Sequence, residues 1–157
     1  MPTARVPKML VRILPLALAL AAALPAQASQ LVIAQPADIR STDPGVNRDD
    51  TTDGVMLNIV EGLVGYRADG TVGPLLAKSV DLSADGLTYT FKLRQGVKFQ
   101  NGAPFTSADV LWNWRRYMDP KTGWRCRSAF DGQTGLKVTD VSAPDAYTVV
   151  MALNRKS

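Results

Sequence analysis

The segment from Leu87 to Val110 constrains the fold of this chain more than any other part of it. Apolar and polar residues alternate from Leu87 to Leu93, which predicts a strand with one apolar face. Two tight turns follow, Gln95-Gly96 and Asn101-Gly102, because glycine supplies the backbone freedom that such turns need. Thr106-Ser107-Ala108-Asp109 fits a capping box, in which a threonine and an acid satisfy backbone groups at a helix start. A strand, two turns and a capped helix in such close succession predict an α+β fold.

We expect two main helices. The first should begin at the caps offered by Thr51-Thr52-Asp53, and apolar residues then recur at helical spacing up to Val60, before Gly62 stops it. The second should run from the capping box to about Met118, where Asp119-Pro120 ends it. The residues expected on its apolar face are Ala108, Leu111, Trp114 and Met118.

Short strands are expected in most of the remaining chain. Their ranges are Leu31–Ala34, Leu63–Tyr66, Ser79–Leu82, Lys137–Val141 and Tyr147–Leu153. The first is wholly apolar, which is typical of a buried, parallel strand. The last two should form a hairpin around a turn at Ala143-Pro144-Asp145. The predicted fold class is α+β, with more strand than helix. The expected parallel strand at the start is a feature of α/β folds, so the class could also be described as α/β in that part.

The N-terminus has the pattern of an export signal. Three basic residues precede an apolar run from Ile13 to Leu24, and Ala26-Gln27-Ala28 supplies the small residues of a cleavage site between Ala28 and Ser29. The run is shorter than the ~20 apolar residues of a membrane-spanning helix, although an uncleaved anchor is the alternative. The residue directly after the site is Ser29 and not a cysteine, so we expect an exported protein without a lipoprotein anchor.

Charge and composition exclude several function classes. The chain carries 18 basic and 14 acidic residues, and removal of the three basic residues of the signal leaves 15 against 14, a balance that does not suggest nucleic acid. The chain contains no histidine, which excludes Ser/His and Cys/His catalysis and histidine metal sites. Cys126, the single cysteine, cannot form an intramolecular disulfide, and we expect it to be buried. We therefore predict no enzyme, no cofactor and no metal site.

A calcium loop is the one metal alternative in the pattern. Asp49, Asp50 and Asp53 could begin such a loop, but the position that needs a bidentate acid holds Val60, and Glu61 misses it by one residue. Helix capping is the better interpretation of these acids.

One block, TFKLRQGVKFQNGAPFTSAD from Thr90 to Asp109, carries a family resemblance. Further matching elements are LVIA at 31–34, Asp43-Pro44, Glu61-Gly62-Leu63, Gly70 to Ala77, Arg116, Asp119-Pro120 and the final TVVMALNR. With these elements the chain resembles the large extracytoplasmic solute-binding proteins of ABC importers for peptides and nickel, the oligopeptide/dipeptide-binding family.

The resemblance implies a partial periplasmic-binding-protein-like fold, in which two lobes close over a ligand. Residues 1–28 would be the signal peptide, residues 29–46 the first strand and loop of the first ligand-binding lobe, and residues 47–157 an extra domain. Relatives are several times longer, so we expect a fragment whose sheet is incomplete because the C-terminal part is missing. The implied function is capture of a solute, a peptide, by a periplasmic monomer that delivers it to an ABC permease in the inner membrane.

The predicted ligand contacts lie in two loops. The first follows the first expected strand and comprises Gln35, Pro36, Ala37, Asp38 and Arg40. Loops at the carboxyl ends of strands are where open α/β sheets bind ligands, and main-chain contacts there would tolerate many peptide sequences. The second contact is Trp124, in the loop after the second helix. The alternatives are a solvated loop for the first and surface packing for the second.

Two other functions stay open on the sequence alone. The chain could be a secreted interaction or regulatory module, or a non-functional truncated product. A hydrolase has little support, since no Gly-x-Ser-x-Gly elbow is present. The ligand class is also open, because peptides, nickel complexes, opines and sugars are all carried by proteins that resemble this one.

Overall fold

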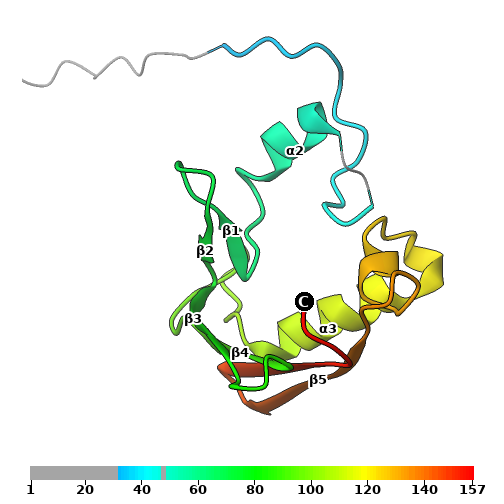
Figure 1. The fold of residues 1–157 in the computed structure, drawn as a ribbon. Coiled ribbons are helices and arrows are strands. Elements are labelled where there is room, and N and C mark those ends of the chain that lie inside the picture. The colour runs from blue at the N-terminus through cyan, green and yellow to red at the C-terminus, as the bar shows by residue number, and fades with distance from the viewer. Residues whose placement is uncertain (1–31, 47–48) are drawn as a thin grey trace, which may run out of the picture. The chain divides into compact units, whose positions relative to one another are not determined.

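The computed structural model describes residues 32–46 and 49–157 (Figure 1). The chain divides into two units, residues 1–34 and residues 35–157, and all helices and strands of the described residues lie in the second. The predicted signal peptide and the Ala28/Ser29 cleavage site lie outside the described residues. Within the part that is described, no helix is long and apolar enough to span a bilayer.

The first unit corrects one prediction. Val32, Ile33 and Ala34 form no strand, and the side chains of Val32 and Ile33 are 78% and 70% exposed. A buried strand needs neighbours that pair with its backbone groups. Neither sheet found in the described residues includes this segment, which explains why the apolar run alone did not produce a strand.

The second unit is organised around a four-stranded antiparallel sheet. Its strands are β3 (Ala77–Leu82), β4 (Thr88–Leu93), β5 (Val138–Asp145) and β6 (Thr148–Leu153). They lie in the order β3-β4-β6-β5 (Figure 1). The predicted strand at residues 87–93 is thus confirmed as β4, one of the two inner strands, and Gly86, at φ 73°, closes the turn that joins it to β3.

The core lies on the face of this sheet that carries Phe91 and Val149. Val149 is completely buried, Leu93 is 3% exposed and Phe105 is 7% exposed. Val149 pairs directly with Phe91 across β4 and β6, so apolar residues at alternate positions meet on one face. Burial of each such side chain stabilises the fold by about 1.5–3 kcal/mol.

Helix α3 (Ser107–Met118) begins at the predicted capping box. The backbone N–H of Thr106 donates to Oδ2 of Asp109 at 2.8 Å, and the Thr106 hydroxyl donates to the same oxygen at 3.1 Å. Of the predicted apolar face, Leu111, Trp114 and Met118 are half-buried, whereas Ala108 is exposed. Val110, which was not predicted, packs against the core. The helix end at Met118 is confirmed.

The hairpin β5-β6 turns later than predicted. β5 continues through Ala143 and Pro144 to Asp145, and the chain reverses at Ala146-Tyr147. The pairing shifts by one residue between Ser142 and Asp145, which accommodates a proline that cannot donate to the ladder. Asp145 also accepts the Tyr147 N–H at 2.8 Å, so its side chain organises the tighter turn.

The region before the sheet holds α2 (Asp50–Met56) and a separate pair of strands, β1 (Val64–Tyr66) and β2 (Val72–Pro74). The strand expected at residues 63–66 is confirmed. The predicted helix is too long, since it ends at Met56 and not near Gly62. Its sequence, DTTDGVM, is poor in helix formers, and Leu57 and Ile59 beyond it are 72% and 56% exposed, so packing does not extend it.

Candidate functional site

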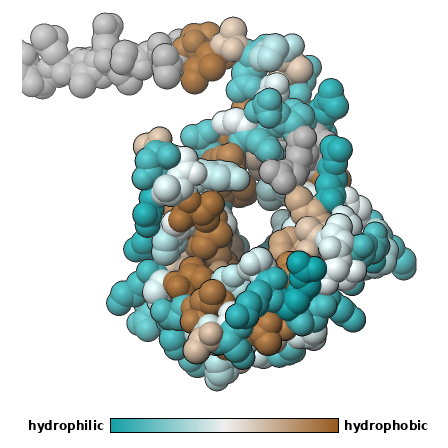
Figure 2. Space-filling model, viewed as in Figure 1, coloured by the Kyte–Doolittle hydropathy of each residue, from teal (hydrophilic) through white to brown (hydrophobic). Residues whose placement is uncertain are grey.

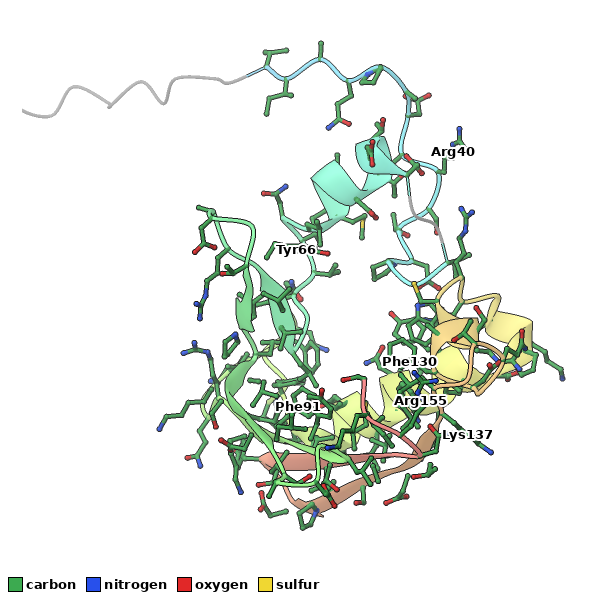
Figure 3. All side chains as sticks on the ribbon, viewed as in Figure 1. Arg40, Tyr66, Phe91, Phe130, Lys137 and Arg155 are labelled. Carbon is green, nitrogen blue, oxygen red and sulfur yellow. The ribbon has the colours of Figure 1, made fainter. Side chains whose placement is uncertain are left out.

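The predicted ligand loop, Gln35–Arg40, is exposed along its whole length. Figure 3 shows the Arg40 side chain extending outward from this loop. The backbone of the loop is anchored at its C-terminal end, because the N–H of Arg40 donates to Oγ1 of Thr52 at 3.1 Å. Thr52 is only 1% exposed, so the anchor itself is shielded from water.

Thr52 is held in turn by the start of α2. The helix is capped by Asp49, whose Oδ1 accepts the Thr52 N–H at 2.9 Å. Thr51-Thr52-Asp53 therefore lies inside the helix, and the predicted cap position is wrong by a few residues. The capping interpretation of the acidic cluster is nevertheless confirmed for Asp49. The N–H of Thr52 is the main cause that lowers the pKa of Asp49, and the charge of Arg40 adds to it.

A turn follows the loop at Asp43–Val46. The Asp43 carboxylate accepts the N–H of Gly45 at 3.2 Å and forms a forked ion pair with Arg116 of α3. Chiefly because of the Arg116 hydrogen bond, the pKa of Asp43 lies below its ordinary value, although burial opposes the shift. The pair thus joins the chain just after the ligand loop to the last turn of α3.

The next residue of α3 extends this contact. Gly45 is buried beneath the Tyr117 ring, and a Cβ at that position would overlap the ring. The Arg116 guanidinium lies 5.4 Å from the centre of the same ring. Burial raises the pKa of the Tyr117 phenol above its ordinary value.

Trp124 lies in an aromatic cluster after α3. It stacks against Tyr117 at 5.2 Å and against Phe130 at 5.4 Å, between ring centres, and Trp114 meets it edge-on at 6.4 Å. Figure 3 labels Phe130 within this group. Because two neighbours already stack on the indole, a ligand contact by Trp124 would have to use the part of the ring that they leave uncovered. Cys126, two residues further on, was expected to be buried, but it is only half-buried.

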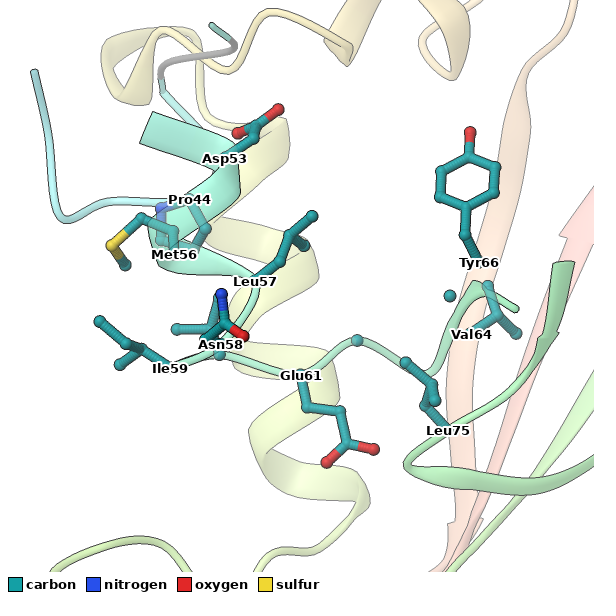
Figure 4. A pocket seen from close by; sticks show the side chains of 13 residues that line it. Pro44, Asp53, Met56, Leu57, Asn58, Ile59, Glu61, Val64, Tyr66 and Leu75 are labelled. Atoms are coloured by element: carbon teal, nitrogen blue, oxygen red, sulfur yellow. The ribbon is translucent and has the colours of Figure 1, made fainter. Parts of the chain in front are cut away.

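A hollow of about 640 Å³ lies between α2 and β1. In Figure 4, side chains of α2 line one side, and Val64 and Tyr66 of β1 line the other. Its principal apolar residues are Met56, Leu57, Ile59, Val60, Val64, Tyr66 and Leu75. Asp53 and Glu61 also line it, and no basic residue does. Figure 2 shows apolar surface over the strands that adjoin the hollow.

The turn that follows the ligand loop, and not the loop itself, is joined to the aromatic cluster of Trp124, through residues that the sequence did not single out as functional. The ligand loop connects through Asp43 to Arg116, and Tyr117 stacks on Trp124. Gln35, Pro36, Ala37 and Asp38 stay in the exposed part of the loop. The sequence marked Asp43-Pro44 and Arg116 only as elements of the family resemblance and gave no sign that they pair. Among the described residues, no group of three potential metal ligands gathers.

Comparison with known proteins identifies the class. Residues 71–157 match the family model described as bacterial extracellular solute-binding proteins, family 5 Middle. The chain therefore belongs to this family of solute-binding proteins, and the resemblance seen in the sequence is confirmed.

Individual relatives share both sequence and fold. A di/tripeptide-binding protein of Pseudomonas aeruginosa is 39% identical over 93% of this chain, which spans 30% of that relative. A peptide-bound OppA of Listeria monocytogenes aligns with a TM-score of 0.70 at 27% identity, over 78% of this chain and 26% of that one. The binding protein AgaA of A. tumefaciens R10, in complex with agropinic acid, aligns with a TM-score of 0.69 at 34% identity, over 76% of this chain and 23% of that one. The α+β class and the partial periplasmic-binding-protein-like fold are confirmed.

Proposed function

We propose that this chain takes part in capturing a short peptide outside the cytoplasm and in delivering it to an ABC-type permease. It is not an enzyme in this proposal; it binds and releases its solute unchanged. The predicted signal peptide would export the chain to the periplasm, with cleavage between Ala28 and Ser29 and without a lipid anchor.

One observation carries the proposal. In a chain of the solute-binding family, the residues of the loop Gln35–Arg40 are all exposed, and the C-terminal end of the loop is anchored by the Arg40–Thr52 hydrogen bond and, just beyond it, by the Asp43–Arg116 pair. Free N–H and C=O groups on a held loop suit main-chain hydrogen bonds to a peptide of variable sequence. A held loop also loses less conformational entropy when a ligand binds than a mobile one does.

The peptide assignment draws on the relatives. The Pseudomonas aeruginosa protein is named for di- and tripeptides, and the Listeria monocytogenes structure holds a peptide. The A. tumefaciens R10 structure, at 34% identity, holds agropinic acid, so a non-peptide solute is the competing assignment.

A titration tests the proposal. The chain from Ser29 onward is mixed with the tripeptide Ala-Ala-Lys carrying fluorescein on the lysine amine, and anisotropy is recorded. We expect saturable binding that unlabelled tripeptide competes away and agropinic acid does not. Competition by agropinic acid alone would reassign the solute, and no binding up to millimolar tripeptide by a folded chain would reject peptide capture.

A second candidate, a secreted interaction module, is favoured by the hollow between α2 and β1. Leu57 and Tyr66 are 72% and 78% exposed and line the same hollow, and exposed apolar residues gathered in one place can mark an interaction site. Cooperative unfolding without any peptide binding would support this candidate over solute capture.

A further inference from the structure

We propose that Asp43, Gly45, Arg116 and Tyr117 form a clasp that holds the C-terminal end of the ligand loop Gln35–Arg40 and links it to the aromatic cluster of Trp124. The inference rests on the proposed function, since it concerns how the loop is presented to a solute. None of the four residues lies in the loop itself, so they act through it and are positioning residues.

A short tether between two anchors follows the ligand loop. Arg40 is fixed through its backbone to the buried hydroxyl of Thr52, and Asp43 is fixed through its side chain to Arg116. Ser41 adds a local bond by accepting the Asp43 N–H at 3.0 Å. With both ends of Arg40–Asp43 held, the last residue of the ligand loop, Arg40, is fixed relative to α2 and α3.

The Asp43 carboxylate accepts hydrogen bonds from both the turn and α3. Its Oδ1 accepts both the Gly45 N–H, at 3.2 Å, and one Arg116 nitrogen, at 3.3 Å, while Oδ2 accepts the other Arg116 nitrogen. A forked guanidinium pair fixes orientation as well as distance. The same carboxylate thus shapes the turn and aligns it on α3.

The Tyr117 ring links the clasp to Trp124. The missing side chain of Gly45 lets the turn approach the Tyr117 ring, and that ring stacks on Trp124 at 5.2 Å. One contiguous set of contacts therefore runs from the loop anchor to the second predicted ligand residue. A contiguous set of packed side chains is a physical route for coupling between the two regions, and the variants below test whether coupling occurs.

The clasp is separable from the folding core. The buried cluster of Leu93, Phe105 and Val149 contains none of its residues. Loss of the clasp should therefore disturb the loop and leave the sheet folded, which allows positioning to be distinguished from general stability.

Two readouts test the inference on Arg116→Ala, with the exposed neighbour Arg115→Ala as the matched control. The first needs no ligand: amide exchange at Arg40 should quicken about tenfold in Arg116→Ala, with β4 and β6 amides unchanged. Unchanged exchange at Arg40, or equal loss of protection throughout β4 and β6, would overturn the clasp.

The second readout is affinity for the fluorescein-labelled Ala-Ala-Lys tripeptide. Arg116→Ala should weaken binding about tenfold, a typical size for coupling between sites, while Arg115→Ala binds as the unaltered chain. Arg116→Lys should recover part of the loss, because it restores the charge but not the fork. Equal binding by both alanine variants, or no recovery in Arg116→Lys, would overturn the inference. If the unaltered chain binds no tripeptide, the proposed function fails and amide exchange alone decides the clasp.

Discussion

The hydroxyl of Ser107 donates a hydrogen bond to the backbone carbonyl of Asp145 at 2.7 Å. The Ser107 N–H also donates to the carbonyl of Ala146 at 2.9 Å, and the serine is only 4% exposed. The first turn of α3 is thereby tied to the reversal between β5 and β6. These two bonds hold the helix on the sheet at the point where the hairpin departs from its predicted turn.

Ser107→Ala should lower the free energy of unfolding by about 1–2 kcal/mol, because the Asp145 carbonyl loses a shielded partner. Ser79→Ala is the control, since the hydrogen bond from its hydroxyl to Asp81 is exposed and long at 3.4 Å, and a change below about 0.5 kcal/mol is expected. Urea denaturation followed by circular dichroism measures the free energy of unfolding of both variants. Equal losses would show that the Ser107 hydrogen bond does not stabilise the fold more than the exposed Ser79 bond does.

Val149→Ala should destabilise the chain by about 2–3 kcal/mol, because the side chain is completely buried between Leu93 and Phe105. Val72→Ala removes the same atoms from a side chain that is 60% exposed, so a loss below about 0.5 kcal/mol is expected. Similar losses of unfolding free energy in the two variants would show that Val149 does not lie in the core.

Replacement by alanine should disturb the structure at Gly45 but stabilise it at Gly54. In Gly45→Ala the new methyl group would overlap the Tyr117 ring, so the turn must move and the fluorescence of neighbouring Trp124 should change. Gly54 lies within α2 with open space around it, so Gly54→Ala should stabilise the helix by up to about 1 kcal/mol. Denaturation and tryptophan emission of both variants check this pair, and destabilisation by Gly54→Ala would argue against α2 as described.

Acid should weaken the Asp43–Arg116 pair. The pKa of Asp43 is lower in the folded chain than its ordinary value of 3.8, so the unfolded chain takes up this proton first as pH falls. The contribution of the pair is therefore complete above pH 3.8 and is lost as pH drops through the folded pKa. The stability difference between the unaltered chain and Asp43→Asn, measured by denaturation from pH 7 to pH 2.5, should shrink over that acidic range and not above it. A difference that instead vanishes near neutral pH would contradict the pair.

Local chemistry explains which elements the sequence predicts well. β4 follows from strict alternation and the start of α3 from a capping box, and both patterns need only neighbouring residues. Gly86 and Gly102 adopt positive φ in turns that were expected for the same reason. Such elements are specified by a few adjacent side chains and so can be read without tertiary information.

Elements that depend on distant partners were mispredicted or missed. Residues 32–34 have the composition of a strand but no pairing neighbour among the described residues, and α2 ends early for want of packing. Asp43 and Arg116 stand 73 residues apart, and no periodicity links them. The stacking of Tyr117 on Trp124 likewise arises only when the loop after α3 folds back. The ligand loop itself remains a prediction.

Amide hydrogen exchange of the chain from Ser29 onward, with and without saturating Ala-Ala-Lys tripeptide, tests the central claim most directly. The account predicts slower exchange at residues 35–40 and around Trp124, with the amides of β4 and β6 unaltered. Protection confined to the hollow between α2 and β1, or no protected amide at all in a folded chain, would contradict it.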